Sequence, residues 1–429
     1  MVHLGLGNFF RAHQAWYTAT AAAEADGWRI AAFTGRSPGV AEALNAQHGR
    51  YTLLVRGPVD DDATVVDVIG AAYPGGDLEA WRAHLAAPRT AVVTLTVTEA
   101  AYLRGPGGGL DEEHPGARAD LAAWRRGEPV HSVPGRLVAG LAERRVAGGG
   151  PLAVVSCDNL PGNGEVTARV VLDFAGLADP ALVPWIHDNV SFVTTMVDRI
   201  TPRTTPEDVR VAAELTGFDD AVPVVTEPFT EWVLGGVFPA GRPGWEAGGA
   251  RFVADVHPHE QRKLLLLNGG HSLLAYAGSA RGHQTIAEAV ADPVCRGWLE
   301  QWWDEAVRHV PLPAAELTAY RAALLDRFAN PRIRHTLAQI AADGSQKVPI
   351  RVLPVLRGER DAGRLPAGAI RALAAWIDHL RGVGAPVSDA GAAPYSRRAS
   401  SVRDVLTLLA PDLAADPILV TEIEKALTT

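Results

Sequence analysis

Hydrophobic and polar positions follow two different rhythms along the chain. Up to about residue 255, short apolar runs alternate with amphipathic helical segments. The strand-like runs span residues 2–4, 29–33, 64–69, 91–97 and 152–156, and the helical patterns span 14–23, 78–86 and 119–145. Because this βαβ alternation is typical of doubly wound folds, we expect a mostly parallel sheet.

From His259 onward, strand-like runs nearly vanish and helical periodicity takes over. The amphipathic segments are residues 260–278, 293–309, 314–328, 334–342, 367–380 and 398–409. This pattern predicts an all-α domain. The stretch between the two patterns, residues 222–251, is rich in Pro, Gly and Trp. We interpret that stretch, with its short apolar piece 222–225, as an extension of the sheet followed by a crossover.

A glycine turn follows the first apolar strand. Gly5 permits a tight turn, and Gly7 lets backbone N–H groups approach a pyrophosphate at the start of the next helix. Phe10 stands where the usual G-x-G-x-x-G pattern has its third glycine. The turn lies between a strand and a helix, which favours dinucleotide binding. The residues predicted to bind the cofactor here are Gly5, Gly7, Asn8, Phe9 and Arg11.

These patterns predict an α/β protein in two parts. A Rossmann-type dinucleotide-binding domain with a mostly parallel, extended sheet is expected over residues 1–255, with its core at 1–165 and the sheet extension at 166–255. An all-α C-terminal domain for substrate binding and catalysis is expected over residues 256–429. In such sheets, ligands bind beyond the carboxyl ends of the strands. Thr98, Glu99 and Asn159 follow two of those ends.

The residues after the second predicted strand bear on the cofactor. An acidic residue there would bind the ribose hydroxyls of NAD, whereas an arginine can meet the 2′-phosphate of NADP. This chain carries Arg36 and no acid at that place. We expect NAD as the cofactor, with NADP open because of Arg36.

Composition narrows the classes of partner. The chain has 429 residues and a net charge of −9, without a strongly basic stretch, so neither nucleic acid nor an anionic membrane is expected as a partner. Only Cys157 and Cys295 are present, so we expect neither a disulfide framework nor a metal site. No apolar run is long enough to span a bilayer. We expect a cytoplasmic protein with little or no leader, either a monomer or a weak oligomer.

The segment from Lys263 to His271 carries the strongest candidate chemistry. On an α-helix, Lys263, Asn268 and His271 would point to about 0°, 140° and 80°, so one side would carry all three polar groups. An ordinary amphipathic helix gives the same periodicity. The segment is therefore either a catalytic site or an ordinary amphipathic helix, and the other motifs of the chain decide between these two interpretations.

Six motifs together resemble the mannitol dehydrogenase family, the zinc-independent long-chain polyol and sugar-acid dehydrogenases. They are Gly5-x-Gly7-x-Phe9-x-Arg11-x-His13, Thr96-Val97-Thr98-Glu99, Ser156-Cys157-Asp158-Asn159 with Asn163-Gly164, Asp198-Arg199-Ile200-Thr201-Pro202, Lys263-x4-Asn268-x2-His271 and Asp343-Gly344-Ser345-x-Lys347. They occur in the family's order from residue 2 to about 350.

The resemblance implies a role for each matched residue. Lys263 matches the catalytic lysine, and Asn159 and Asn268 match the asparagines that polarise the substrate oxygen. His271 matches the histidine that orients substrate, and Glu260 matches a proton-path glutamate. Asp198 and Lys347 match residues that line the substrate site. The implied reaction is hydride transfer between a nicotinamide cofactor and C2 of an open-chain polyol or sugar acid.

The substrate stays open at this point. Gln339 stands where mannitol-specific members often have arginine, and we associate glutamine there with the sugar-acid and broader polyol branches. Mannitol/fructose and mannonate/fructuronate are therefore both retained. A carboxylate would need a cation, for which the candidates are Lys347, Arg351, Arg332 and Arg334.

The chemistry explains why these residue types are needed. Oxidising a secondary alcohol removes the hydroxyl proton while hydride leaves the carbon. Lys263 can take that proton only when it is neutral, so its pKa must fall well below the usual value of about 10.4. Two other functions remain possible: a non-catalytic dinucleotide-binding sensor, and a hydroxyacid or phosphogluconate-type dehydrogenase.

Overall fold

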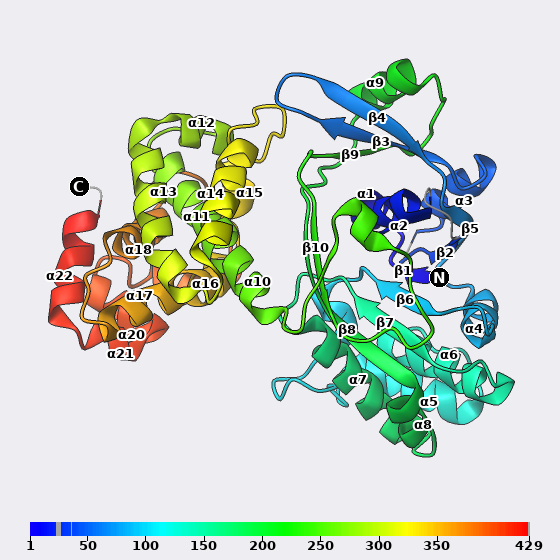
Figure 1. The fold of residues 1–429 in the computed structure, drawn as a ribbon. Helices are drawn as coiled ribbons and strands as arrows, with labels where there is room; N and C mark the ends of the chain where they lie inside the picture. Colours follow the sequence, from blue (N-terminus) through cyan, green and yellow to red (C-terminus); the bar gives the residue numbers. More distant parts are fainter. Residues whose placement is uncertain (23–26, 36, 428–429) are drawn as a thin grey trace. The chain divides into compact units, whose positions relative to one another are not determined.

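The chain divides into two compact units in the computed structural model (Figure 1). The structure describes residues 1–22, 27–35 and 37–427, and the units are Met1–His257 and Pro258–Thr429. Among the helices of these described ranges, none is both long and apolar enough to cross a bilayer.

An eight-stranded sheet forms the centre of the first unit. Its strand order is β11-β10-β8-β7-β6-β1-β2-β5. The bounds are β1 (Val2–Leu4), β2 (Ile30–Phe33), β5 (Ile69–Tyr73), β6 (Val92–Leu95), β7 (Leu152–Ser156), β8 (Val190–Asp198), β10 (Glu231–Gly235) and β11 (Arg251–Phe252). All neighbours pair in parallel except β8 and β10. The portion from β5 to β8 has the strand order of Rossmann folds. The predicted mostly parallel, extended sheet is confirmed.

Helices cover both faces of this sheet (Figure 1), which explains why its central strands are apolar throughout. One layer contains α4 (Leu78–Ala86), α5 (Pro115–Arg126), α6 (Val133–Ala147), α7 (Asn163–Ala178) and α8 (Leu182–Asn189). The other contains α1 (Asn8–Ala12), α2 (Gln14–Ala22) and α3 (Gly39–Ala46). β1, β2, β6 and β7 are buried at every position.

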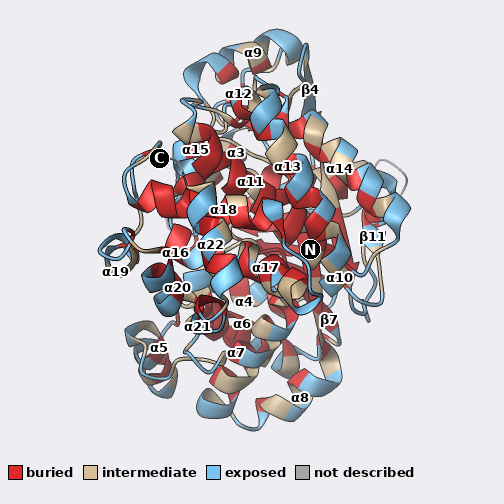
Figure 2. Ribbon diagram, turned by 90° about the vertical axis from the view of Figure 1, so that its left-hand side faces the viewer, coloured by how far each residue is buried: buried red, intermediate tan, exposed pale blue. Residues whose placement is uncertain are grey.

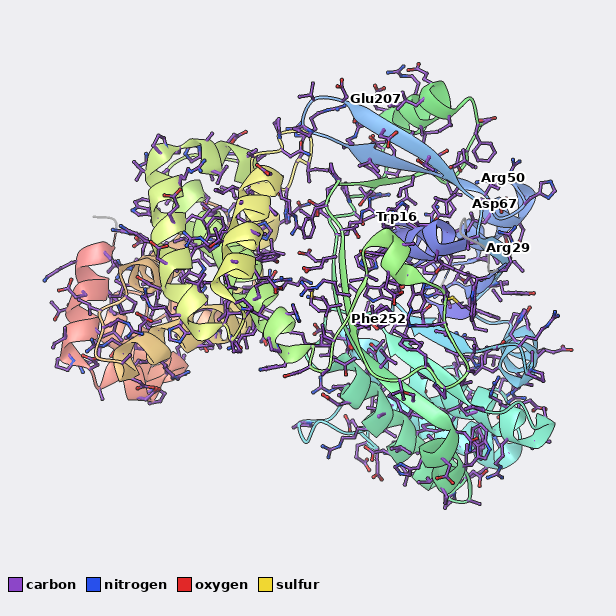
Figure 3. All side chains as sticks on the ribbon, viewed as in Figure 1. Trp16, Arg29, Arg50, Asp67, Glu207 and Phe252 are labelled. Atoms are coloured by element: carbon purple, nitrogen blue, oxygen red, sulfur yellow. The ribbon has the colours of Figure 1, made fainter. Side chains whose placement is uncertain are left out.

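A second, three-stranded sheet corrects two sequence predictions. The single strand predicted at 64–69 is two strands: β4 (Asp61–Val66) pairs with β3 (Tyr51–Arg56), and β5 starts at Ile69 in the main sheet. The run is broken by Asp67, whose carboxylate lies 3.8 Å from Arg29 Nη1 (Figure 3).

The predicted extension at 222–225 is also wrong. That segment belongs to β9 (Val224–Thr226), which pairs in parallel with β3 in the second sheet, and α9 (Pro206–Thr216) packs on this sheet. β10 and β11 extend the main sheet instead. An apolar run shows that a strand is buried, but it does not show which sheet receives it.

The second unit is helical in all its described elements, which confirms the predicted C-terminal fold. Its longer helices are α13 (Pro293–Ala306), α14 (Ala314–Phe328), α16 (Gly344–Arg351), α17 (Leu353–Asp361), α18 (Ala367–Leu380), α20 (Val402–Leu409) and α22 (Pro417–Ala426). α18 is buried along almost its whole length and contacts α13 and α22 (Figure 2). α16 and α17 were not predicted, because Pro349 and Pro354 interrupt their pattern.

The segment that carries Lys263 is not a regular α-helix. After α10 (His257–Arg262), the residues Lys263–Asn268 form a π-helical stretch, η3. α11 (Gly269–Leu273) and a second π-helical stretch, η4 (Leu274–Gly278), continue the helix. A π-helix bonds residue i to residue i+5, so Lys263 and Asn268, five apart, lie on the same side. The α-helical angles assumed from the sequence placed them further apart.

Two buried tryptophans of α13 hold this π-helical stretch. The N–H of Gly269 bonds to the carbonyls of Leu264 and Leu266, leaving the carbonyl of Leu265 without the bond it would accept in an α-helix. Trp302 Nε1 donates to the Leu265 carbonyl at 2.9 Å, and Trp303 Nε1 donates to that of Leu266 at 2.9 Å. The Trp302 bond therefore compensates for the missing α-helical bond at the buried Leu265, and the Trp303 bond adds a second donor at Leu266.

Glycine at position 269 makes this packing possible. A Cβ there would lie 2.4 Å from Cζ2 of Trp302, although the backbone conformation is helical. We predict that Gly269→Ala lowers the free energy of unfolding by about 1–3 kcal/mol, because the indole must move. The matched control is Gly297→Ala in α13, where a Cβ meets nothing within 4 Å; it should be neutral or stabilising by up to about 1 kcal/mol. Chemical denaturation measures both values, and equal stabilities of the two variants would contradict the packing.

Candidate functional site

One edge of the main sheet collects the predicted site residues of the first unit. β8, β7, β6 and β1 are consecutive neighbours, and all four run in the same direction. Beyond their carboxyl ends lie the glycine turn after β1, Thr98 and Glu99 after β6, and Asn159 after β7. Asp198 is the last residue of β8. Thr98, Glu99 and Asn159 are exposed, whereas Asp198 is buried.

The glycine turn fits a dinucleotide. Gly5 has φ +109°, and a Cβ there would lie 2.0 Å from the carbonyl oxygen of Thr96, so only glycine fits. At Gly7 the nearest atom to a Cβ would be 3.6 Å away, which leaves the backbone open to a close ligand. α1 begins directly after Gly7, and no side chain caps it. Its first N–H groups face the turn, where a pyrophosphate would accept them.

Arg11 braces this turn from inside the protein. Its guanidinium is buried and donates to the carbonyl of Gly7 at 3.3 Å, to Asn8 Oδ1 at 2.8 Å and to the carbonyl of Val222. Phe9 stacks on His13, with ring centroids 5.0 Å apart. These motif residues therefore shape the loop that the sequence assigns to the cofactor. Arg36, the residue that keeps NADP open, lies outside the described residues.

A second buried arginine supports the end of β8. Arg199 donates to the carbonyl of Ala12 at 2.6 Å and to that of Glu227 at 3.2 Å. Its guanidinium lies 4.9 Å from the ring of Trp16 on α2 (Figure 3). It thus ties the residue after Asp198 to the end of α1, so the sheet edge and the glycine turn form one braced structure.

In the second unit, His271 is the most enclosed of the predicted residues. It is 7% exposed, stacks on Phe328 at 4.6 Å and meets the ring of His335 at 5.1 Å. Burial, followed by electrostatic interactions with His335, Arg327 and Arg351, holds its pKa well below the usual value. Its Nε2 has no hydrogen-bond partner among the described residues. A neutral imidazole with an unused nitrogen is suited to bind a hydroxyl group.

Lys347 lies near the start of α16, in a turn that is fixed from both sides. Its Nζ donates to the carbonyl of Ile340 at 3.1 Å and to that of Ala342. Asp343 has φ +56° and starts α16, and Ser345 binds Asp389 through its N–H and hydroxyl. Burial, with help from the charge of Arg351, lowers the pKa of Lys347. Gln339 lies exposed in the first turn of α15 (Leu337–Ala341).

Arg351 lies one helical turn beyond Lys347 and reaches the segment that carries Lys263, Asn268 and His271. Its Nη1 lies 3.2 Å from Ser272 Oγ and 3.5 Å from the carbonyl of Asn268. Its buried Nε has no partner within the described part of the chain. Burial lowers its pKa, and an interaction with Tyr276 opposes that effect. The sequence named Arg351 only as one of four cations for a carboxylate; its contact with α11 is a tertiary feature.

The sequence did not reveal a buried polar cluster beside Asn159. Tyr102 lies at the end of the 3₁₀ helix η1 (Glu99–Tyr102), and its hydroxyl lies 2.6 Å from Ser156 Oγ and 2.6 Å from Asp158 Oδ2. Burial raises the pKa of Asp158 to about 7, opposed by the Tyr102 hydrogen bond. Ser156 and Asp158 belong to a motif quoted above, but nothing in the sequence connects Tyr102 to them.

One group of metal-binding residue types comes together within the described ranges: His283, Asp292 and Cys295. Asp292 Oδ2 accepts from Arg281 Nε at 2.6 Å and lies 3.0 Å from His283 Nε2, and Oδ1 caps α13. Burial and the Asp292 charge raise the pKa of Cys295 to about 11, so the thiol keeps its proton. These side chains bond to one another and serve the helix start, and we assign them no metal.

A Rossmann-type unit with an open glycine turn, followed by a helical unit that carries a lysine, amide and imidazole on one segment, defines the class of two-domain dehydrogenases. The family model for the mannitol dehydrogenase Rossmann domain matches residues 1–247, and that for the mannitol dehydrogenase C-terminal domain matches residues 255–429. The chain belongs to the mannitol dehydrogenase family, as its motifs indicated, and it is an oxidoreductase.

Individual relatives agree with this assignment. Mannitol 2-dehydrogenase of Cereibacter sphaeroides is 38% identical over 89% of this chain and 81% of its own length. D-mannonate oxidoreductase of Escherichia coli (strain K12) is 38% identical over 89% of this chain and 80% of its own. Among solved structures, Pseudomonas fluorescens mannitol 2-dehydrogenase in complex with NAD and D-mannitol matches with a TM-score of 0.82 and 34% identity, over 99% of this chain and 90% of that one. The hydroxyacid or phosphogluconate-type alternative is thereby set aside.

The raised pKa of Asp158 gives a pH-dependent stability. In the unfolded chain its pKa is near the ordinary 3.8, and in the folded protein it is about 7. Its contribution is therefore complete below pH 3.8 and is lost as the pH rises through about 7. We predict that, from pH 4 to pH 8, wild type loses roughly 2–4 kcal/mol of stability relative to Asp158→Asn. Urea denaturation at both pH values measures this difference, and parallel stability curves would contradict it.

Proposed function

We propose that this protein catalyses hydride transfer between NAD and C2 of an open-chain polyol or sugar acid, with Lys263 as the general base. The observation that carries the proposal is the π-helical stretch, which aligns Lys263 with Asn268 one turn before a buried, neutral His271. In a member of the mannitol dehydrogenase family, this set matches the needs of alcohol oxidation.

Each residue has one task in the proposed reaction. Lys263, in its neutral form, takes the hydroxyl proton and passes it toward Glu260, three residues earlier on α10. The amides of Asn159 and Asn268 donate to the developing alkoxide, and each such donor typically lowers a barrier by about 3–4 kcal/mol. His271 stays neutral because its pKa is low, so it orients substrate through hydrogen bonding without exchanging a proton. The proposed step uses no metal.

NAD, when bound, accepts the hydride on its nicotinamide ring. We assign its pyrophosphate to the Gly5–Gly7 turn, which Arg11 holds in place, and we place Thr98 and Glu99 against the cofactor. These two residues lie exposed at the adjacent strand end. NADP stays possible through Arg36.

The charges around His271 favour a sugar acid among the possible substrates. Arg327 and Arg351 act on His271 as positive neighbours. The guanidinium of Arg351 has a buried Nε without a partner. Partly buried cations are stabilised by an anion that they can bind. We therefore propose that Arg351 and Lys347 bind the carboxylate of a substrate of the mannonate/fructuronate type, while Asp198 and Gln339 contact its hydroxyl groups.

Removing the proposed base tests the mechanism. Lys263→Ala should bind NADH with unchanged affinity and lose about 10²–10⁴-fold in turnover, because the proton has no acceptor. Lys425→Ala is the matched control, since that lysine is exposed and pairs with Glu422 on its own helix. Steady-state kinetics and cofactor titration give both quantities. A Lys263→Ala variant that keeps more than roughly a tenth of wild-type turnover would disprove the assignment.

Removing the proposed carboxylate partner tests the substrate class. For Arg351→Gln, kcat/KM for a keto sugar acid should fall about 10–100-fold more than kcat/KM for the matching neutral ketose, since only the acid loses a charged hydrogen bond. Arg357→Gln on α17 is the control, because that guanidinium is more exposed and pairs with Asp412 at 2.7 Å. Equal losses on both substrates would mean that Arg351 only supports the helix.

A further inference from the structure

The cluster of Tyr102, Ser156 and Asp158 links the two strand ends that carry proposed functional residues. Tyr102 lies in the segment after β6. Ser156 is the last residue of β7, and Asp158 lies two residues beyond it. All three side chains are buried, at 0%, 0% and 6% exposure. The Tyr102 hydroxyl bonds to both of the others, at 2.6 Å each. A buried network in which each polar group has a partner fixes one arrangement of its chain segments.

Asp158 is held through its main chain as well as its side chain. Its carboxylate accepts from Tyr102 and from the backbone N–H of Val97. Its carbonyl accepts from Asn163 Nδ2 at 2.9 Å and from the N–H of Leu160 at 2.8 Å. The Asn163 amide also donates to and accepts from the backbone of Thr195 on β8. Residue 158 therefore ties the ends of β6 and β7 together and, through Asn163, connects them to Thr195 within β8.

The segments tied at this point are those that we assign to cofactor and substrate. Thr98 and Glu99 lie between Val97 and Tyr102, and both ends of that short segment bond to Asp158. Asn159 is the next residue, exposed between the buried Asp158 and Leu160. We propose that Asp158 and Tyr102 are a positioning pair, which sets Asn159 and the Thr98–Glu99 segment for hydride transfer. This inference rests on the proposed function.

Within the pair, Asp158 titrates in a range where activity is measured, since burial raises its pKa to about 7. Besides Tyr102, the titratable groups that act on Asp158 or feel its charge are Glu99 and the buried thiol of Cys157. Glu99 raises the pKa of Asp158, and Tyr102 lowers it. A change in the protonation of Asp158 alters the hydrogen bond that holds both segments. A purely structural contact would affect stability but not the pH profile of turnover.

The test is Tyr102→Phe, which keeps the aromatic ring in its apolar cluster with Leu160 and Val170 and removes only the hydroxyl. Tyr73→Phe is the matched control, because its hydroxyl bonds His84 at 3.0 Å in the same unit. The quantities measured are kcat, KM for the sugar, Kd for NADH and Tm. We expect kcat of Tyr102→Phe to fall at least tenfold and Kd for NADH to rise several-fold, with KM little changed and Tm lowered no more than in the control. In Asp158→Asn, kcat should also lose its dependence on pH near neutrality.

Other outcomes decide against the pair. If kcat and Kd for NADH of Tyr102→Phe both stay within twofold of the control, or if activity falls only in proportion to lost folded protein, the pair is structural. If Tyr102→Phe does not fold, Asp158→Asn is judged by the same quantities. If the wild type turns over no ketose or keto acid, the proposed function is wrong. The positioning pair is then tested by Kd for NADH alone: a several-fold rise in Tyr102→Phe supports the pair, and an unchanged Kd overturns it.

Discussion

The hydrogen bonds from two buried indoles to the carbonyls of Leu265 and Leu266 are the constraint on which the proposed chemistry of the second unit depends. They compensate for the α-helical bond that the Leu265 carbonyl lacks, and they stabilise a helix wound with i to i+5 bonding. The same stretch that carries Lys263 and Asn268 is thus shaped from behind by α13. Small residues at positions 269 and 270 are needed so that the rings can approach.

In the first unit, the positions of the candidate site residues are fixed at one edge of the main sheet. Parallel pairing brings four strand ends side by side, and buried polar groups then fix the loops that follow them. Arg11 holds the glycine turn, Arg199 holds the end of β8, and Asp158 holds the loops after β6 and β7. In each case a buried polar or charged group bonds to main-chain atoms, to side chains or to both, so that removing it would leave unpaired groups in the interior.

The sequence predicted most elements correctly because their periodicity is local. The helices at 78–86, 314–328 and 367–380 and the strand at 152–156 coincide with α4, α14, α18 and β7. The strand predicted at 64–69 failed because a continuous apolar run does not reveal the change of sheet at Asp67. The π-helical stretch could not be foreseen, since the groups that stabilise it lie 37 residues away in sequence.

Among the candidate site residues, the motifs located the strand ends and the segment that carries Lys263, but not the supporting contacts. Arg11 was expected at the cofactor, and the structure shows that its guanidinium bonds protein oxygens. Tyr102 and the contact of Arg351 with α11 depend on tertiary structure, so no spacing rule indicates them. Matching motifs identify the residue types of a site. Only the folded structure shows which of those residues contact one another.

The most direct test of the account follows the hydride itself. Purified protein would be incubated with NADH carrying deuterium at the transferable position of the ring, together with a keto sugar acid, and the product examined by NMR and mass spectrometry. The account predicts one deuterium, bound to the carbon that carried the carbonyl, and slower turnover than with unlabelled NADH. Product hydrogen at that carbon derived from solvent, or NADH that binds without giving up its deuterium to any ketose or keto acid, would contradict it.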